Sequence, residues 1–291
     1  MPFKIRQAKV DLMHFPHFNV PVFCFKPFVV TIHDLILKRF PTRRVSALEP
    51  FSYWFKNLAY HLVIYSAVKR SKKIIAISNY TKKDILKYFN IDSEKIKVIY
   101  EGSPQEVFSS SNDNLLKKHN ISKPYLLYVG NAYPHKNLER LIMAFDKLSK
   151  KNGMQLILVG RLDYFYRKIQ KKFSGFKNIV FTDFILDKDL PILYQNASLY
   201  IFPSLCEGFG LPPLEAMTYQ IPVVCSKATC LPEILGKATI YFNPEDIEDM
   251  KQKIKLVLED KKLQKQLILQ GNKKIREYSW VKMAREILTI Y

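Results

Sequence analysis

Ten short runs of apolar and β-branched residues recur along the chain, and segments with helical periodicity separate them. The first four runs are VDLMHF, FVVTIHDL, KIIAIS and KIKVIY, and the next six are YLLYVG, QLILVG, IVFTDF, LYIFPS, PVVCS and ATIYF. Segments such as NLERLIMAFDKLSKK and DLPILYQNA between them are amphipathic. Apolar strands that alternate with helices are typical of parallel sheets covered on both faces. The sequence therefore predicts an α/β fold of doubly wound, Rossmann-like sheets.

This rhythm lapses in EGSPQEVFSSSNDNLLKKHNISK, where Ser, Asn, Pro and Gly cluster. Because linkers of this composition mark boundaries, we expect one Rossmann-like domain over residues 1–112 and a second over 113–275. The closing segment WVKMAREILTIY has an apolar face that needs a partner. We expect residues 276–291 to form a helix that packs back toward the N-terminal domain.

Composition narrows the classes of partner. The 291 residues carry a formal net charge of +20, and residues 1–120 hold 20 Lys and Arg against 9 Asp and Glu. This excess predicts an anionic partner, but no nucleic-acid recognition motif accompanies the charge, so we expect no nucleic-acid partner. No apolar run approaches the roughly 18 residues that cross a bilayer, and we expect a cytoplasmic protein. The four cysteines contain no Cys-x-x-Cys pair, which predicts reduced thiols and no metal site.

The stretch CEGFGLPPLEAM holds two carboxylates eight positions apart. Glu207 is expected in the loop that follows the strand LYIFPS, and Glu215 in the first turn of the next helix. Gly208 and Gly210 let the backbone approach a ligand closely, and the N–H groups of a helix start favour an anionic one. Open α/β sheets bind ligands at this edge. The stretch is therefore predicted to be part of a binding site.

FPSLCEGFGLPPLEAM, followed by IPVVCS and LPEILG, resembles the signature of the family 4 retaining glycosyltransferases of the GT-B fold. YVGNAYPHKNLERLIMAF resembles the donor-phosphate segment of that family, and LVGRLDYFY is similar to the segment after it. The resemblance extends from about VDLMHF to the C-terminus. It implies transfer of a sugar from a nucleotide diphosphate to a glycan or lipid-linked acceptor in polysaccharide biosynthesis. It also implies retention of configuration, front-face departure of the diphosphate, and no metal or other cofactor.

The resemblance also implies roles for particular residues. Glu215 matches the glutamate that binds the ribose hydroxyls, and Glu207 the one beside the transferred sugar. Lys136 matches the basic residue that neutralises the leaving diphosphate, and His33 a histidine near the donor sugar; with Glu207, these two are the predicted catalytic residues. The other predicted donor-binding residues are Arg161, Gly208, Phe209, Gly210, Leu211, Gly130 and Asn131. His14, His17 and Asn19 are expected to line the acceptor site, and for each histidine a structural role is the alternative.

The donor remains open at this stage. The segments PHKN and DYFY look most like the corresponding segments of mannosyltransferases that use GDP-mannose, and a UDP-sugar is the alternative donor. His135 stands where many relatives have arginine, which removes one expected phosphate contact. Relatives usually begin with a strand and a glycine-rich loop before VDLMHF, so we expect a shortened acceptor half. A module that binds the nucleotide sugar without transferring it is a second class of function.

Two further segments have alternative interpretations. The segment FSYWFKNLAYHLVIYSAVKRSKK interleaves aromatic and basic residues and contains no acidic residue. This pattern is typical of a helix that contacts an anionic membrane surface, which here would be the inner face of the membrane. A buried helix with a basic end is the alternative. The triplet DKD, Asp187 to Asp189, spells the metal-binding motif of another glycosyltransferase fold. Because it precedes a helical segment, we expect it to cap that helix.

Overall fold

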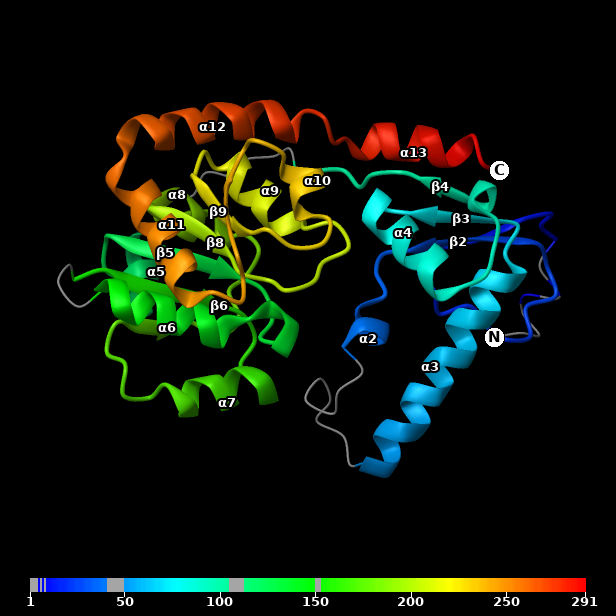
Figure 1. Ribbon diagram of the computed structural model, residues 1–291, viewed down its shortest axis with the longest axis horizontal. Helices are drawn as coiled ribbons and strands as arrows, with labels where there is room; N and C mark the ends of the chain where they lie inside the picture. The colour runs from blue at the N-terminus through cyan, green and yellow to red at the C-terminus, as the bar shows by residue number, and fades with distance from the viewer. Residues whose placement is uncertain (1–4, 6, 8, 41–49, 105–112, 150–152) are drawn as a thin grey trace. The chain divides into compact units, whose positions relative to one another are not determined.

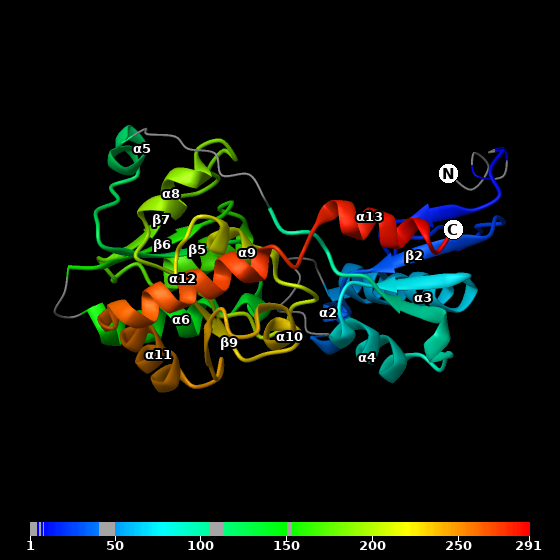
Figure 2. The same ribbon diagram turned by 90° about the horizontal axis from the view of Figure 1, so that it is seen from above.

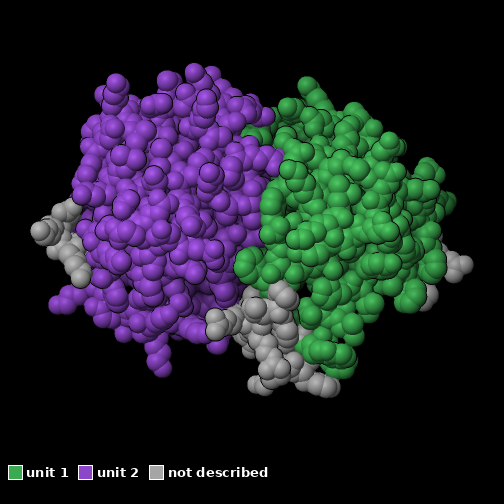
Figure 3. Space-filling model, viewed as in Figure 1, with its two compact units in different colours: residues 1–102, 278–291 green, residues 103–277 purple. Residues whose placement is uncertain are grey.

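The computed structural model describes residues 5, 7, 9–40, 50–104, 113–149 and 153–291 (Figure 1). The chain divides into two compact units, coloured separately in Figure 3: residues 1–102 with 278–291, and residues 103–277. Each unit contains a sheet in which every paired strand is parallel to its neighbours. The predicted α/β class is therefore confirmed. The domain boundary expected at residue 112 lies in 105–112, outside the described residues.

The sheet of the first unit has the order β1-β2-β3-β4. Its strands are β1 (Met13–Phe15), β2 (Phe28–Ile32), β3 (Lys73–Ala76) and β4 (Ile96–Val98). The helical elements of this unit are α2 (Ile36–Arg39), α3 (Pro50–Arg70), α4 (Asn79–Tyr88), the 3₁₀ turn η2 (Ser93–Lys95) and α13 (Trp280–Leu288). Within the described ranges, no helix is both long enough and apolar enough to span a bilayer.

Alternate residues of these strands face two different helix layers. Val30, Ile32 and Ile74 pack in a core that also contains Ile64 and Val68 of α3. The opposite face presents Val29 and Ile75, which pack with Ile99 and with Met283 and Ile287 of the C-terminal segment. Strand side chains alternate between faces with a period of two. The apolar face of α13 is thus satisfied inside the first unit.

The second unit holds a six-stranded sheet of order β10-β9-β8-β5-β6-β7. Its strands are β5 (Tyr125–Val129), β6 (Gln155–Val159), β7 (Ile179–Phe181), β8 (Leu199–Phe202), β9 (Val223–Ser226) and β10 (Ile240–Phe242). The helical elements are α5 (Asp113–Lys118), the 3₁₀ turn η3 (Pro134–Lys136), α6 (Leu138–Ser149), α7 (Tyr164–Lys172), α8 (Leu190–Asn196), α9 (Leu211–Thr218), α10 (Leu231–Leu235), α11 (Ile247–Glu259) and α12 (Lys261–Ile275). In this unit α6 and α7 lie on one face of the sheet, and α8, α9 and α12 on the other (Figures 1 and 2).

Read from β7 to β10, the strands follow the order of the dinucleotide-binding fold, with chain order 3-2-1-4-5-6. The direction of winding reverses between β5 and β8, which pair through Leu126 with Leu199 and Leu127 with Tyr200. Doubly wound sheets bind ligands outside the carboxyl ends of the strands at such a reversal. The loops after β5 and β8 are therefore the expected place for a site.

Two expectations about helix starts are wrong. Helix α9 begins at Leu211, directly after Gly210, so Glu215 is its fifth residue and lies beyond the first turn. Gly210 has a left-handed backbone (φ 97°), and this conformation starts the helix earlier than the proline pattern indicated. Asp189 occupies the N-cap position of α8, but its side chain makes no capping hydrogen bond because its backbone is α-helical rather than extended.

Candidate active site

The turn η3 places Lys136 at the carboxyl end of β5. Asn137 follows it with a left-handed backbone (φ 61°) and ends the turn. The buried Asn137 amide donates hydrogen bonds to the carbonyl of Pro203 (3.1 Å), after β8, and to that of Pro244 (2.7 Å). The amide of Leu205 donates to the carbonyl of His135 at 2.7 Å. These bonds tie the loop after β5 to the loop after β8.

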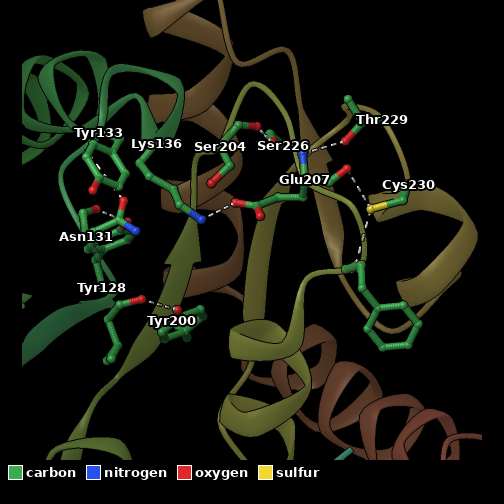
Figure 4. Close-up of polar contacts among 12 residues, drawn as sticks. Tyr128, Asn131, Tyr133, Lys136, Tyr200, Ser204, Glu207, Ser226, Thr229 and Cys230 are labelled. Carbon is green, nitrogen blue, oxygen red and sulfur yellow. Dashed lines mark hydrogen bonds and ion pairs between the residues drawn. The ribbon is translucent and has the colours of Figure 1, made fainter. Parts of the chain in front are cut away.

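Lys136 and Glu207 meet across these two loops. Lys136 Nζ donates to Glu207 Oε1 at 2.6 Å, and the two side chains are only 14% and 11% exposed (Figure 4). The ammonium also lies 5.5 Å from the centre of the Phe202 ring. Because the pair is largely shielded from water, its attraction is stronger than that of a surface ion pair. The structure thus brings together two of the three predicted catalytic residues.

The backbone of Glu207 is held on both sides by the loop after β9. Its N–H donates to Thr229 Oγ1 at 3.0 Å, and its carbonyl accepts from the Cys230 thiol at 3.3 Å (Figure 4). The same thiol donates to the carbonyl of Phe209 at 3.4 Å. Burial, with the neighbouring Glu207 carboxylate, raises the pKa of Cys230 well above its ordinary value, which keeps the thiol a donor. Cys230 is therefore a structural thiol of the site.

Glu215 lies on α9 against α8. Its carboxylate is half-buried and accepts a hydrogen bond from the Tyr194 hydroxyl at 3.2 Å. Burial raises the pKa of Glu215, the Tyr194 hydrogen bond lowers it, and the charge of Asp187 raises it. Glu207 and Glu215 thus differ in environment, since Glu207 is paired with a cation and Glu215 with a neutral donor.

Two glycines allow a close approach of backbone at this edge. A Cβ on Gly210 would lie 2.7 Å from Leu231, and one on Gly160, after β6, would lie 2.1 Å from the carbonyl oxygen of Gly130. Phe209 is buried, and Leu211 is the first residue of α9. Asn131 follows Gly130 on an exposed loop, where its carbonyl accepts from the Tyr128 hydroxyl at 2.7 Å. Gly208, Phe209, Gly210 and Leu211 thus follow β8, whereas Gly130 and Asn131 follow β5.

Arg161 follows β6 rather than β5 or β8. It is exposed on the loop after β6, where its charge, with that of Arg167, helps the backbone N–H groups of Leu162 and Phe184 to lower the pKa of Asp183. Asp183 Oδ1 accepts from Leu162 at 2.9 Å. In the described contacts Arg161 therefore belongs to the neighbourhood of Asp183, on the loops after β6 and β7.

His135 is a buried neutral residue. Burial, reinforced by the charge of Lys136, lowers the pKa of His135 to about 4. It is 7% exposed, and its ring stacks at 6.0 Å from that of Tyr133. At neutral pH it adds no positive charge to the loop that carries Lys136.

His33 lies in the first unit at the carboxyl end of β2. Its Nδ1 lies 2.9 Å from Glu101 Oε1, after β4, and its Nε2 lies 2.8 Å from the carbonyl oxygen of Pro16, after β1. A carbonyl oxygen only accepts, so Nε2 donates to Pro16, and Nδ1 donates to Glu101 as well when the ring is protonated. The hydrogen bond with Glu101 is the largest cause that raises the pKa of His33. These contacts favour the charged imidazolium form of His33.

The two histidines expected to line the acceptor site have different surroundings. His14 Nε2 lies 2.8 Å from Thr31 Oγ1, and its Nδ1 lies 2.6 Å from the hydroxyl of Tyr291, so both nitrogens are engaged in packing β1. His17 is exposed on the loop after β1, and its ring stacks 6.2 Å from that of His33. Asn19 donates its backbone N–H to His17 Nδ1 at 3.4 Å.

Sequence reasoning missed several residues that hold the site together. Asn137, Thr229 and Tyr194 are polar residues whose contacts lie 66, 22 and 21 positions away in the chain. No local sequence pattern indicates these three contacts, because each joins residues on separate elements. The hydroxyl of Ser204, fully buried after β8, has no hydrogen-bond partner within the described part of the chain.

The second unit thus combines a shielded cation, a carboxylate paired with it, and a second half-buried carboxylate on the next helix. A lysine at the carboxyl ends of β5 and β8 can bind an anion, and a carboxylate with free lone pairs can accept from hydroxyl groups. This arrangement fits a ligand that carries both phosphate and sugar hydroxyls.

Comparisons with known proteins agree with this chemistry. Residues 111–274 match the sequence model described as glycosyl transferases group 1, and residues 1–105 match the one described as glycosyltransferase family 4. The chain is 27% identical over 299 residues to an O-antigen chain mannosyltransferase B of Escherichia coli. The alignment covers 99% of this chain and 75% of that protein. It is 33% identical over 238 residues to the O-antigen chain mannosyltransferase RfbU of Salmonella typhimurium. That alignment covers 79% of this chain and 64% of the relative.

Solved structures share the fold. The structure of HepE from Anabaena in complex with UDP and glucose has a TM-score of 0.79 and 19% sequence identity, and covers 99% of this chain and 80% of that one. Sucrose-phosphate synthase from Thermosynechococcus elongatus has a TM-score of 0.77 and 20% identity, with 99% and 75% covered. The chain therefore belongs to the glycosyl transferases group 1, and it is a glycosyltransferase built from the two parallel-sheet units of the GT-B fold.

Proposed function

We propose that the chain transfers mannose from GDP-mannose to a hydroxyl of a glycan or lipid-linked acceptor, with retention of configuration. The observation that carries the proposal is the Lys136–Glu207 contact of 2.6 Å, which joins the loops after β5 and β8 where the winding of the sheet reverses. The similarity to two O-antigen mannosyltransferases supports mannose as the sugar. The second unit binds the donor, and the first unit presents the acceptor.

Each residue has a defined role in this proposal. Lys136 breaks its contact with Glu207 and binds the diphosphate. It stabilises the negative charge that develops as the diphosphate departs, and this electrostatic stabilisation is usually the largest catalytic contribution. Glu207 faces the transferred sugar and stabilises its developing positive charge. Glu215 accepts from the ribose hydroxyls in charge-assisted bonds worth about 1.5–3 kcal/mol each. The amides of the Gly208–Leu211 stretch, with Gly130 and Asn131, line the path of phosphate and sugar, and Arg161 provides a further cation.

His33 supplies positive charge rather than a base. Glu101 and Pro16 hold its imidazolium at the carboxyl edge of the first sheet. A histidine whose charged form is favoured in this way attracts an anionic group and is a weaker base than an ordinary histidine. We therefore assign to His33 an electrostatic role toward the donor or a phosphate-bearing acceptor, and no role in proton abstraction.

Calorimetric titration of the chain with GDP and with UDP tests the proposal. We expect GDP to bind, the variant Glu215→Ala to bind it much more weakly, and Glu207→Ala to bind it as wild type does while losing transfer. Binding of UDP instead of GDP would replace GDP-mannose with a UDP-sugar. Binding of GDP without transfer or slow donor hydrolysis would indicate a nucleotide-sugar-binding module. Binding of neither nucleotide would refute the donor site.

We also propose that the first unit contacts an anionic membrane surface through α3. One side of this helix packs in the core through residues such as Tyr60, Ile64 and Val68, whereas the opposite side is apolar and exposed. Among the side chains of α3 that the structure describes, the large exposed ones are Trp54, Phe55, Leu58, Leu62 and Tyr65. The helix has no acidic residue and ends at Lys69 and Arg70. A second apolar side flanked by basic residues fits the headgroup region of a bilayer.

Vesicle sedimentation tests this contact. We expect wild type to sediment with phosphatidylglycerol vesicles in a salt-sensitive way, and the double variant Leu58→Glu, Leu62→Glu to remain in the supernatant. Leu269→Glu on α12 is a matched control, because Leu269 is an equally exposed helical leucine in the second unit. Absence of wild-type sedimentation would refute membrane contact, and unchanged sedimentation of the double variant would exclude α3.

A further inference from the structure

Tyr194 differs from neighbouring buried tyrosines in what its hydroxyl contacts. The hydroxyls of Tyr125, Tyr166 and Tyr200 donate to backbone carbonyls, those of Leu193, Gly130 and Val129 respectively. The Tyr194 hydroxyl instead donates to a side-chain carboxylate, that of Glu215, at 3.2 Å. A backbone carbonyl needs a donor for stability alone, whereas an oriented carboxylate can bind a ligand.

The Tyr194 ring is held firmly along α9. It is fully buried, and it stacks on Tyr219 with ring centres 5.1 Å apart and planes 3° from parallel. Tyr219 follows Glu215 by four residues, so both side chains lie on one side of α9. The Tyr200 ring lies 5.8 Å away on β8, and the hydroxyl of Tyr125 anchors α8 at Leu193. Tyr194 is therefore a rigid donor rather than a mobile one.

We propose that Tyr194 is a positioning residue for the nucleotide: its hydroxyl occupies one oxygen of Glu215 and directs the carboxylate toward the ribose hydroxyls. This inference rests on the proposed function of Glu215. Because Glu215 lies beyond the first turn of α9, the helix dipole does little to hold its charge. The Tyr194 hydrogen bond provides the orientation that a first-turn position would have obtained from backbone N–H groups.

Charged and titratable neighbours make the idea testable by pH. Burial raises the pKa of Glu215, Tyr194 of α8 lowers it through the hydrogen bond, and Asp187, on the loop before α8, raises it. Tyr200 of β8 is within electrostatic reach of Glu215 and stays neutral, because burial raises its own pKa well above the ordinary value. Protonation of Glu215 removes a charge-assisted acceptor for the ribose. Removal of Tyr194 and removal of the Asp187 charge should therefore change nucleotide binding in opposite directions on acidification.

The experiment titrates GDP, or UDP if that is the nucleotide bound, against the full chain between pH 4.5 and 8. We expect Tyr194→Phe to bind about tenfold more weakly at neutral pH, and to lose affinity on acidification at a higher pH than wild type. Asp187→Asn should keep its affinity to a lower pH. Tyr241→Phe is the control, since it deletes a tyrosine hydroxyl on β10 that donates to a backbone carbonyl, that of Gly236, at 2.8 Å, and it should keep the wild-type pH profile.

A ligand without ribose hydroxyls separates positioning from a general structural effect. The 2′,3′-dideoxynucleoside diphosphate cannot donate to Glu215, so Tyr194→Phe and wild type should bind it equally. An equal loss of affinity for both ligands, or a wild-type pH profile in both Tyr194→Phe and Asp187→Asn, would overturn the role of Tyr194. If Glu215→Ala binds the natural nucleotide as wild type does, the proposed function of Glu215 fails instead.

Discussion

Lys136 Nζ lies 2.6 Å from Glu207 Oε1, and this contact links the loops that follow the two strands at the reversal of the second unit's sheet. The two side chains are more than four-fifths buried. A diphosphate that binds at this edge must compete with Glu207 for the same ammonium. In the proposed function, this competition would release the carboxylate for the transferred sugar.

Replacement of Lys136 should weaken binding of the diphosphate group specifically. We expect Lys136→Ala to reduce affinity for GDP by about ten- to a hundredfold, because one charge-assisted bond of about 1.5–3 kcal/mol is lost. Affinity for guanosine, which has no phosphate, should stay within about twofold. Calorimetric titration of both ligands measures the difference. Lys136→Arg keeps the charge and should recover most of the GDP affinity, and an equal loss for guanosine and GDP would contradict the assignment.

Replacement of Glu207 should reduce the transfer rate without weakening GDP binding. Glu207→Gln keeps the shape of the side chain but removes its charge, and we expect the transfer rate to fall by at least about a hundredfold through loss of electrostatic stabilisation. GDP affinity should be unchanged or tighter, because Lys136 no longer has an internal anion. Transfer and donor hydrolysis assays together with GDP titration test both parts. Weaker GDP binding with normal turnover would assign Glu207 to the nucleotide instead.

His33 should make the stability of the first unit depend on pH. Its pKa is raised in the folded state by Glu101, so its contribution is complete below the unfolded value of about 6.5 and disappears as the pH rises through the folded pKa. We expect wild type to exceed His33→Gln in stability at pH 6 and the difference to shrink in more alkaline buffer. Urea unfolding across this range measures it. A difference that grows with pH would show that His33 is neutral in the fold.

His135 should make the stability of the second unit decrease as the pH falls. Burial lowers its pKa to about 4, so its protonation is opposed by folding, and stability falls as the pH drops from about 6.5 toward 4. The full effect corresponds to about 3 kcal/mol at about 1.36 kcal/mol per pKa unit. We expect His135→Gln to lose less stability than wild type over this interval in urea unfolding. Parallel curves for the two proteins would mean that His135 is charged or exposed.

The strands could be predicted because parallel sheets buried on both faces need continuous apolar runs. Each of the ten predicted runs contains one of the described strands, from Met13–Phe15 to Ile240–Phe242. Periodicity also located α6 (Leu138–Ser149) and α13 (Trp280–Leu288), whose apolar sides repeat every three to four residues. Local pattern thus defines the fold class, because each element must bury its own apolar side.

The side-chain contacts of the site join residues that are far apart in the sequence, so no local pattern predicts them. Glu207 meets Lys136 over 71 positions and Thr229 over 22, and these distances are set by how strands pair rather than by neighbouring residues. His33 was predicted from the family resemblance, but its contact with Glu101 joins residues 68 positions apart. The charge state of His33 therefore followed only from the structure, and so did the partnership of Tyr194 with Glu215.

The close approach of the loops after β5 and β6 should make Gly160 irreplaceable. A Cβ there would lie 2.1 Å from the backbone oxygen of Gly130 and 2.6 Å from the Tyr166 ring. Since backbone cannot move away as a flexible side chain can, we expect Gly160→Ala to destabilise the second unit by about 1–3 kcal/mol. Gly175→Ala is the control, because a Cβ at Gly175 has no atom within 4 Å and should be neutral or stabilising. Urea unfolding compares the two variants. Equal stability of both would mean that the loops after β5 and β6 can separate without cost, and GDP binding by Gly160→Ala would then be unaffected.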